Sequence, residues 1–106
     1  MIKKILITGG SGLCGNILFA GLSKYGYKIK SCDINTKLSL AAKSLNIKIN
    51  KNVKKIDLRN MSQVLKITKG MDAIIHFGGI ARHKSSEDKY KNIINHNIIG
   101  TYNVFE

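Results

Sequence analysis

The sequence predicts a single α/β domain built on a doubly wound parallel sheet, with helices on both faces. Two observations carry this prediction. Short apolar runs alternate with stretches of helical periodicity along all 106 residues, which is the pattern of repeated strand–helix–strand units. The first apolar run also ends in a cluster of glycines, Thr8-Gly9-Gly10-Ser11-Gly12-Leu13-Cys14-Gly15. Hydrophobic residues make up 43 % of the chain, enough for the core of one domain of this size.

Each element follows from the local pattern. The expected elements, in chain order, are a strand at residues 2–7, a helix at 13–25, a strand at 27–33, a short helix at 38–45, a strand within 47–56, a helix at 60–69, a strand at 73–77 and a helix from about residue 86. The first strand hardly alternates between apolar and polar residues, which predicts burial on both faces. Asn60 and Gln63 have the spacing of a capping box. Gly70 is suited to the position just beyond the end of that helix.

The glycine cluster has the spacing of a phosphate cradle. Gly9, Gly12 and Gly15 stand three residues apart, after a buried strand and at the start of a helix, which is the context that a dinucleotide-binding fingerprint requires. Gly9 can turn the chain, Gly12 lets the backbone approach a pyrophosphate, and Gly15 lets the helix pack against the strand. The first-turn N–H groups, at Leu13 and Cys14, face the anion with the positive end of the helix dipole. The fold is therefore expected to be of the Rossmann type.

The second strand ends in a carboxylate at the position where such folds bind a ribose. Asp33 follows the last glycine of the cluster by 18 residues, and we assign it, with the neighbouring Ile34, to the adenosine half of a dinucleotide. A carboxylate there accepts hydrogen bonds from the ribose hydroxyls and repels the 2′-phosphate of NADP, so NAD is the favoured cofactor. A turn aspartate before Asn35 is the alternative for Asp33. Lys30 and Lys37 leave NADP as the less favoured cofactor.

Three further segments, taken with the glycine cluster, resemble the NAD-dependent epimerase/dehydratase family, also called the extended short-chain dehydrogenases/reductases. In the family's order they are Ile56-Asp57-Leu58-Arg59, His76-Phe77-Gly78-Gly79 and Asn97-x-x-Gly100-Thr101-x-Asn103-Val104. The resemblance covers the whole chain, and the four segments together are specific to the family rather than to a substrate.

The resemblance assigns the strand ends to parts of the cofactor. It implies that Asp57 and Leu58, after the third strand, contact the adenine. It also implies that Phe77, Gly78 and Gly79, after the fourth strand, line the two riboses. A simple turn is the alternative for the two glycines, but their expected place beside the nicotinamide half favours close backbone approach.

Several of these residues also have plainer interpretations. Asp57 can cap the turn before Asn60 instead of meeting adenine. His76 can equally be a core histidine whose hydrogen bonds are satisfied. Asn97 lies on the apolar face of its helix and must find a partner there; the resemblance implies that it anchors backbone or ordered water around the active site. Cys14, although at a helix N-terminus, is interpreted as a packing residue.

The catalytic pair of the family, a tyrosine followed four residues later by a lysine, does not occur in this sequence. Four residues after the four tyrosines stand Ile29, Ser31, Ile94 and Glu106. We therefore expect no catalytic residue here. We expect residues 1–106 to be the N-terminal part of a longer dinucleotide-binding domain, truncated after about four strands.

Within the family, the amino-acid sequence at residues 76–80 and 97–103 is most similar to that of uronate dehydrogenases. The implied function is the NAD-binding portion of a sugar-directed oxidoreductase. Ala81 stands where those enzymes usually carry a serine that contacts the substrate. A nucleotide-sugar epimerase or dehydratase, and a non-catalytic dinucleotide-sensing protein, are the alternatives. The implied partners are a sugar or sugar-nucleotide substrate and, through the last helix, a second copy of the chain.

Composition argues against other partner classes. The net charge of +12 comes almost wholly from lysine, with 16 lysines and 2 arginines spread along the chain, whereas arginine is the preferred residue for nucleic-acid recognition. We expect no nucleic-acid partner. No apolar run approaches the ~18 residues of a membrane span. The two cysteines, Cys14 and Cys32, form no metal-ligand or disulfide pattern, which fits the cytoplasm.

Overall fold

A computed structural model describes residues 1–79, 91 and 93–106 of the chain. Within them lies one parallel four-stranded sheet in the order β3-β2-β1-β4. The strands are β1 (Lys4–Thr8), β2 (Lys28–Asp33), β3 (Val53–Lys55) and β4 (Ala73–His76). The strand order reverses direction beside β1, so the carboxyl ends of β1 and β4 flank a topological switch point. Open α/β sheets bind their ligands at this place.

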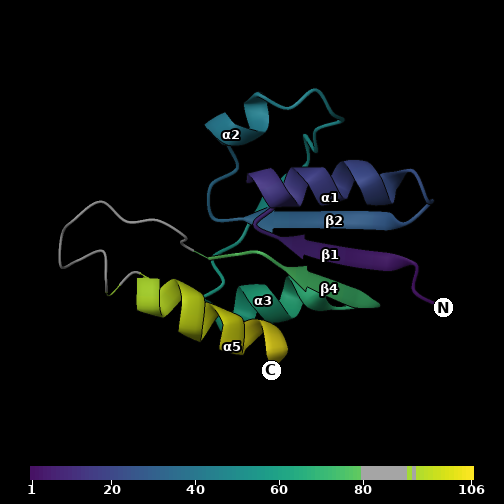
Figure 1. The fold of residues 1–106 in the computed structure, drawn as a ribbon. Helices are drawn as coiled ribbons and strands as arrows, with labels where there is room; N and C mark the ends of the chain where they lie inside the picture. Colours follow the sequence, from purple (N-terminus) through teal and green to yellow (C-terminus); the bar gives the residue numbers. More distant parts are fainter. Residues whose placement is uncertain (80–90, 92) are drawn as a thin grey trace.

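Helices cover both faces of the sheet, as a doubly wound fold requires. They are α1 (Leu13–Ser23), α2 (Leu40–Lys43), α3 (Met61–Thr68), the π-helix η1 (Asn95–Ile99) and α5 (Gly100–Phe105). Figure 1 shows α1 on one face with α2 beyond it, and α3 and α5 on the other face. The predicted α/β, Rossmann-type class is therefore confirmed. Among the residues described, no helix is long and apolar enough to cross a membrane.

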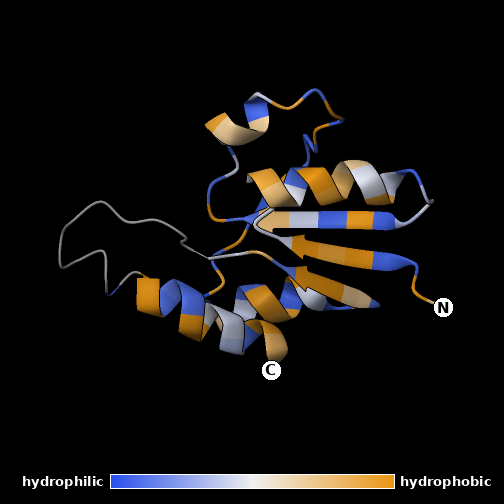
Figure 2. Ribbon diagram, in the orientation of Figure 1, coloured by the Kyte–Doolittle hydropathy of each residue, from blue (hydrophilic) through white to orange (hydrophobic). Residues whose placement is uncertain are grey.

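The central strand β1 is buried, as its apolar pattern predicts. Four of its five residues are buried, and Leu6 and Ile7 have no exposed surface. Figure 2 shows β1 and β4 as more hydrophobic than β2. On the α3 and α5 side, the buried core cluster consists of Leu6, Cys32, Leu58, Val64, Ile67 and Val104.

The first strand begins at Lys4 rather than at residue 2. The N–H groups of Lys3 and Lys4 donate to one carboxylate oxygen of Asp72, at 2.8 and 2.9 Å. These two N–H groups are bonded to the Asp72 carboxylate and not to a neighbouring strand. The carboxylate therefore determines where β1 begins. The ladder then runs on through Thr8, one residue beyond the predicted end.

Helix α1 ends at Ser23, two residues earlier than predicted. The N–H of Tyr25 donates to the carbonyl of Leu22 over a tighter turn, at 3.1 Å. Gly26 then adopts a φ of +81°, in the left-handed region that favours glycine. The apolar periodicity continues past Ser23, but the turn chemistry ends the helix.

Three other elements are shorter than the sequence predicts. Helix α2 fills only part of residues 38–45, because Ser39 caps it by accepting a hydrogen bond from the Ala42 N–H at 3.1 Å. Strand β3 fills three residues of 47–56, the length over which it pairs with β2. Strand β4 ends at His76, one residue early.

The predicted capping box of α3 is half formed. The Asn60 side chain accepts a hydrogen bond from the Gln63 N–H at 3.2 Å. The Gln63 side chain, however, accepts from the N–H of Asp57 at 2.8 Å rather than from that of Asn60, because the Asn60 N–H donates to the Asp57 carbonyl. Gly70, with a φ of +78°, follows the helix as predicted.

The last helical stretch differs from a regular α-helix. Residues 95–99 form a π-helix, in which the Gly100 N–H donates to the Asn95 carbonyl. Gly100 then packs against Leu58, and a Cβ at Gly100 would lie 3.1 Å from the Leu58 Cβ. The Asn103 side chain donates to the Leu58 carbonyl at 2.8 Å. The predicted beginning of this helix, near residue 86, lies outside the described residues.

Candidate functional site

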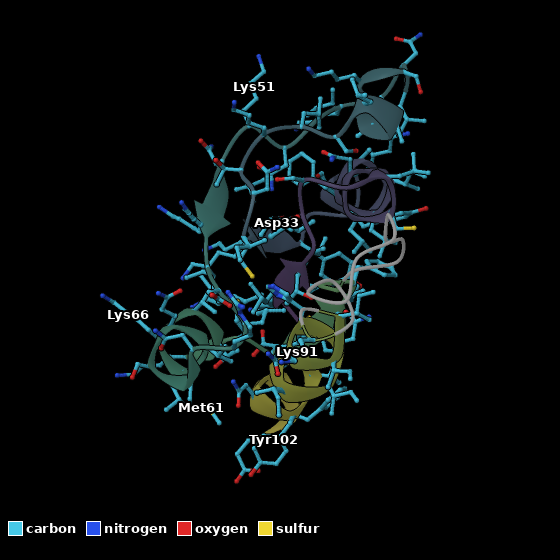
Figure 3. All side chains as sticks on the ribbon, turned by 90° about the vertical axis from the view of Figure 1, so that its left-hand side faces the viewer. Asp33, Lys51, Met61, Lys66, Lys91 and Tyr102 are labelled. Atoms are coloured by element: carbon cyan, nitrogen blue, oxygen red, sulfur yellow. The ribbon has the colours of Figure 1, made fainter. Side chains whose placement is uncertain are left out.

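A cavity of about 110 Å³ lies where the carboxyl ends of the strands meet. It is lined by Gly9, Cys32, Asp33, Ile34, Ile56, Leu58, Gly78, Gly79 and His96. Figure 3 looks onto this edge of the sheet, with Asp33 near the middle of the view. Six of the residues singled out by sequence are therefore brought together: Gly9, Asp33, Ile34, Leu58, Gly78 and Gly79.

The glycines of the loop between β1 and α1 have different surroundings. Gly9 makes the turn, with a φ of +72°, and its Cβ would lie 2.8 Å from the backbone carbon of Phe77. Gly15 lies so close to the loop that a Cβ would overlap the Gly9 carbonyl oxygen and approach the Gly10 Cα to 2.9 Å. A Cβ at Gly12 would have ordinary contact with the protein, 3.5 Å from its nearest atom. Among the residues that the structure describes, none fills the space beside Gly12.

The loop is held from inside by Asn16, a residue that sequence reasoning missed. Its side chain is fully buried and its amide donates to the carbonyls of Gly10 and Gly12, at 3.2 and 2.8 Å. Asn16 lies in the first turns of α1, just after Leu13 and Cys14 at the helix start. These bonds fix the loop ahead of the helix N-terminus, where backbone N–H groups and the helix dipole favour an anion.

Asp33 connects the glycine loop to the turn after β2. One carboxylate oxygen accepts a hydrogen bond from the Ser11 N–H at 3.1 Å, and the other accepts from the Asn35 N–H at 3.2 Å. The turn contact that the alternative interpretation expected is therefore present, in a residue that also lines the cavity. A carboxylate has about four lone-pair sites, so two bonds leave acceptor capacity on the cavity side.

The structure places Asp57 in the turn before α3 and not among the residues that line the cavity. Its carboxylate accepts three hydrogen bonds from the Arg59 guanidinium, the shortest at 2.7 Å, and one from the Arg59 N–H at 3.0 Å. The Arg59 guanidinium holds the pKa of the Asp57 carboxyl below its usual value. This arrangement matches the turn-capping alternative. Its neighbour Leu58 does reach the cavity.

The end of β4 lies against the end of β1 and the η1 helix. A Cβ at Gly78 would lie 2.5 Å from a methyl carbon of Leu58 and 3.1 Å from the Thr8 hydroxyl. A Cβ at Gly79 would lie 2.8 Å from the side-chain oxygen of Asn97. Asn97 is therefore beside the Gly78–Gly79 backbone, although it does not line the cavity. Phe77 is half exposed and does not line it either.

His76 is a half-buried histidine with partners on both ring nitrogens. Its Nδ1 lies 2.6 Å from the Thr8 hydroxyl and its Nε2 lies 2.9 Å from the Thr101 hydroxyl. Burial lowers its pKa, so the ring is neutral near pH 7. The hydrogen bonds of His76 are therefore satisfied, as the interpretation as a core histidine expected, although the ring is only partly buried.

The two cysteines and His96 complete the surroundings of the site. Burial, and next the charge of Asp33, raise the pKa of the Cys32 thiol to about 12, so Cys32 lines the cavity as a neutral thiol. Cys14 is exposed, which contradicts its interpretation as a packing residue. Burial, and next the charge of Arg59, lower the pKa of His96.

Sequence reasoning missed three lining residues: Cys32, Ile56 and His96. Cys32 and Ile56 directly precede Asp33 and Asp57, which were singled out. Including every residue at a strand end would therefore have identified both. His96 is brought in from a distant helix, for which the sequence carries no signal. Ala81, where a substrate-contacting serine was expected, lies outside the described residues.

The site is built for binding. Its lining combines apolar side chains, glycine backbone and one carboxylate, and no group of residues within the described ranges could hold a metal ion. The space at Gly12, ahead of a helix N-terminus, suits phosphate groups. The carboxylate of Asp33, at the end of the strand that follows α1, suits a hydroxyl-bearing sugar. The residues present therefore fit a dinucleotide.

The comparisons with known proteins agree with this chemistry. A model of the NAD dependent epimerase/dehydratase family matches residues 5–106. The chain is 31 % identical over 104 residues to a uronate dehydrogenase of Pseudomonas putida, covering 98 % of this chain and 35 % of that protein. It is 34 % identical over 116 residues to UDP-glucose 4-epimerase 2 of Arabidopsis thaliana, covering 100 % of this chain and 33 % of that protein.

Among solved structures, the chain is similar to a mutant uronate dehydrogenase of Agrobacterium tumefaciens complexed with NAD. The TM-score is 0.73 at 28 % sequence identity, and the match covers 99 % of this chain and 36 % of that one. The chain thus spans about a third of the length of the relatives that it matches.

Proposed function

Because the chain belongs to the NAD-dependent epimerase/dehydratase family, we propose that it forms the NAD-binding portion of a sugar-directed oxidoreductase. The observation that carries the proposal is the cavity in which Asp33 and the Gly78–Gly79 backbone meet the turn at Gly9. When bound, NAD would supply a carbon centre that accepts a hydride from the sugar. The chain's own residues bind and orient the cofactor.

Each part of the cofactor has a proposed set of contacts. The pyrophosphate lies in the space beside Gly12, against the first-turn N–H groups of Leu13 and Cys14. The ribose hydroxyls of adenosine donate hydrogen bonds to the Asp33 carboxylate oxygens, which have acceptor capacity left. This favours NAD over NADP, because a 2′-phosphate next to a carboxylate is repelled.

The remaining contacts lie on either side of this ribose. Ile34 and Leu58 offer apolar surface to the adenine ring. The Gly78–Gly79 backbone and the nearby Asn97 lie toward the nicotinamide half. A contact between Asp57 and the adenine amino group stays a prediction, since Arg59 engages that carboxylate.

We propose a sugar acid as the substrate, oxidised at C1 as in uronate dehydrogenases. The similarity to the uronate dehydrogenases of Pseudomonas putida and Agrobacterium tumefaciens supports this choice. The similarity to a UDP-glucose 4-epimerase supports the second candidate, a nucleotide-sugar epimerase. The test is an assay of the full-length protein with each substrate class.

In that assay, D-glucuronate with NAD should give NADH, seen by its absorbance. UDP-glucose should not be converted to its C4 epimer in a coupled assay. The reverse pattern would favour the epimerase. Saturable NAD binding with turnover of neither substrate would contradict the sugar-acid assignment and favour a dinucleotide sensor, an alternative motivated by the missing tyrosine–lysine pair.

We also propose that the protein acts in the cytoplasm and pairs with a second copy of itself. Both cysteines are free thiols, which suits a reducing compartment. The last helical stretch exposes apolar side chains, at Ile94, Ile98, Ile99, Tyr102 and Phe105, and such a patch is typical of an interface. Light scattering of the full-length protein should give the mass of a dimer, and the mass of a monomer would contradict the pairing.

A further inference from the structure

His96 lines the cavity from the last helical stretch, and the dinucleotide contacts proposed above give it no role. It lies in the π-helix η1, and π-helical turns are frequent at functional sites. Gly100, four residues further on, packs against Leu58, and residues four apart share one face of a helix. Figure 1 shows this helical stretch on the same face of the sheet as α3. His96 therefore lies on the side of its helix that meets Leu58 and the cavity.

The charges nearest to His96 come from the turn before α3. Burial, and next the charge of Arg59, lower the pKa of His96, while the charge of Asp57 opposes them. The ring is therefore neutral near pH 7. Within the described part of the chain, Asp33 and Cys32 are the other ionisable groups that line the same cavity.

The ring of His96 has hydrogen-bonding capacity that the protein does not use. Both ring nitrogens of His76 have hydroxyl partners, whereas no residue that the structure describes hydrogen-bonds to the ring of His96. A neutral imidazole has one acceptor nitrogen and one N–H donor. His96 thus brings an unused acceptor to a partly buried position in the cavity.

The adenine of NAD requires such an acceptor. Its amino group is a hydrogen-bond donor, and a donor that is buried without a partner is costly. The Asp57 carboxylate already accepts four hydrogen bonds from Arg59, which is about its full capacity. Of the described side chains that line the cavity, Asp33 and His96 are the strong acceptors, and the proposed function assigns Asp33 to the ribose.

We propose that His96 is a cofactor-binding residue that accepts a hydrogen bond from the amino group of adenine. The base then lies against the apolar surface of Ile34 and Leu58, with His96 at its edge. Asn97, next in the chain, lies beside Gly79, so neighbouring residues of one helix contact the two halves of the cofactor. This role rests on the proposed binding of NAD.

Calorimetric titration of full-length variants with NAD, and with ADP-ribose, which lacks the nicotinamide, tests this role. His96→Ala should weaken the binding of both ligands about three- to tenfold, through the loss of one hydrogen bond. His96→Asn and His96→Gln place an amide oxygen near the positions of Nδ1 and Nε2, and one of them should bind both ligands within about twofold of wild type. Asn95→Ala, at an exposed position of the same π-helix, is the matched control and should bind as wild type.

The acceptor role also predicts a pH dependence of binding. Protonation of His96 removes its acceptor nitrogen. Because the pKa of His96 lies below its ordinary value, the affinity of wild type for NAD should fall several-fold between about pH 6.5 and about pH 5. The amide variant that restores binding should lose much less affinity over this range, since an amide does not titrate.

Four results would overturn the proposal. They are wild-type affinity of folded His96→Ala for both ligands, weaker binding of NAD with unchanged binding of ADP-ribose, no recovery in either amide variant, and an equal pH dependence in wild type and the amide variants. If His96→Ala only lowers the melting temperature while its folded fraction binds as wild type, His96 is structural and the proposal is wrong. A wild-type protein that binds no NAD would instead overturn the proposed function.

Discussion

At the residue scale, the glycines of the loop and of α1 allow binding and packing to be tested separately. The three atoms nearest to a Cβ at Gly15 are backbone atoms of Gly9 and Gly10, which cannot move aside cheaply, so Gly15→Ala should destabilise the fold by about 1–3 kcal/mol. At Gly21, in the same helix, a Cβ would meet no described residue within 4 Å outside its own stretch of helix. Gly21→Ala should therefore stabilise the protein by about 0.5–1 kcal/mol. Urea unfolding measures both.

Gly12→Ala completes this series. The fold has room for its Cβ, so the free energy of unfolding should change by less than about 1 kcal/mol, the scale of an altered N-cap. NAD binding should nevertheless weaken markedly, because the methyl group occupies the proposed pyrophosphate space. Wild-type affinity in Gly12→Ala would contradict that placement of the pyrophosphate.

A second residue-scale prediction concerns pH. Burial lowers the pKa of His76 below its ordinary value, so between the two pKa values the unfolded chain binds more protons than the folded one. The free energy of unfolding must then rise with pH in that window. We expect stability to fall as the pH is lowered from about 7 to about 5.

Urea unfolding at several pH values checks this, with His76→Gln as the comparison. The variant should be less stable near neutral pH, since it loses a bond to Thr8 or Thr101, and its stability should depend less on pH below about 6.5. An equal pH dependence in wild type and variant would show that another group carries the effect.

The sequence predicts the backbone positions of the site better than its side-chain contacts. Asp33 and Gly78 come together at one edge because the carboxyl ends of parallel strands must meet there, and strand ends can be found from apolar runs. The ion pair of Asp57 with Arg59 depends on how one long side chain folds back across a two-residue turn. No spacing rule specifies that choice.

At the element scale, helix α3 tests how much one cap contributes. Asn60 accepts the Gln63 N–H, and N-caps of this kind contribute about 1 kcal/mol. Asn60→Ala should therefore lower the free energy of unfolding by about 0.5–2 kcal/mol. Asn46→Ala, at an exposed position between α2 and β3, is the matched control and should change it by less than about 0.5 kcal/mol. Equal effects would mean that the cap contributes nothing specific.

Helix and strand identities follow from apolar periodicity, whereas their ends follow from polar contacts. Periodicity predicts that α1 and β1 exist, but Gly26 ends the helix and the Asp72 carboxylate delays the strand. The π-helix at Asn95–Ile99 could not be predicted, because the apolar residues on either side of it keep ordinary helical spacing. The ends of the elements and the π-helix are therefore determined by tertiary contacts and not by local propensity.

At the scale of the whole molecule, the order β3-β2-β1-β4 decides where the site lies. It brings the glycine loop after β1, the carboxylate after β2 and the glycines after β4 to one edge, and helices flank the sheet on both faces (Figures 1 and 3). Strand–helix alternation was sufficient to predict this order of layers, since parallel strands require crossover helices. The topology of the sheet thus determines where the site lies, and the side chains determine its local contacts.

The central claim is that Asp33 binds the ribose of NAD at this edge, and calorimetric titration of NAD into full-length Asp33→Ala tests it most directly. Glu106→Gln is the control: it also removes one negative charge, from a residue that does not line the cavity. Circular dichroism establishes that both variants fold. With two hydrogen bonds to a charged acceptor lost, Asp33→Ala should bind NAD roughly 10- to 100-fold more weakly, while Glu106→Gln binds as wild type. An Asp33→Ala protein that folds and binds NAD with wild-type affinity would contradict the account.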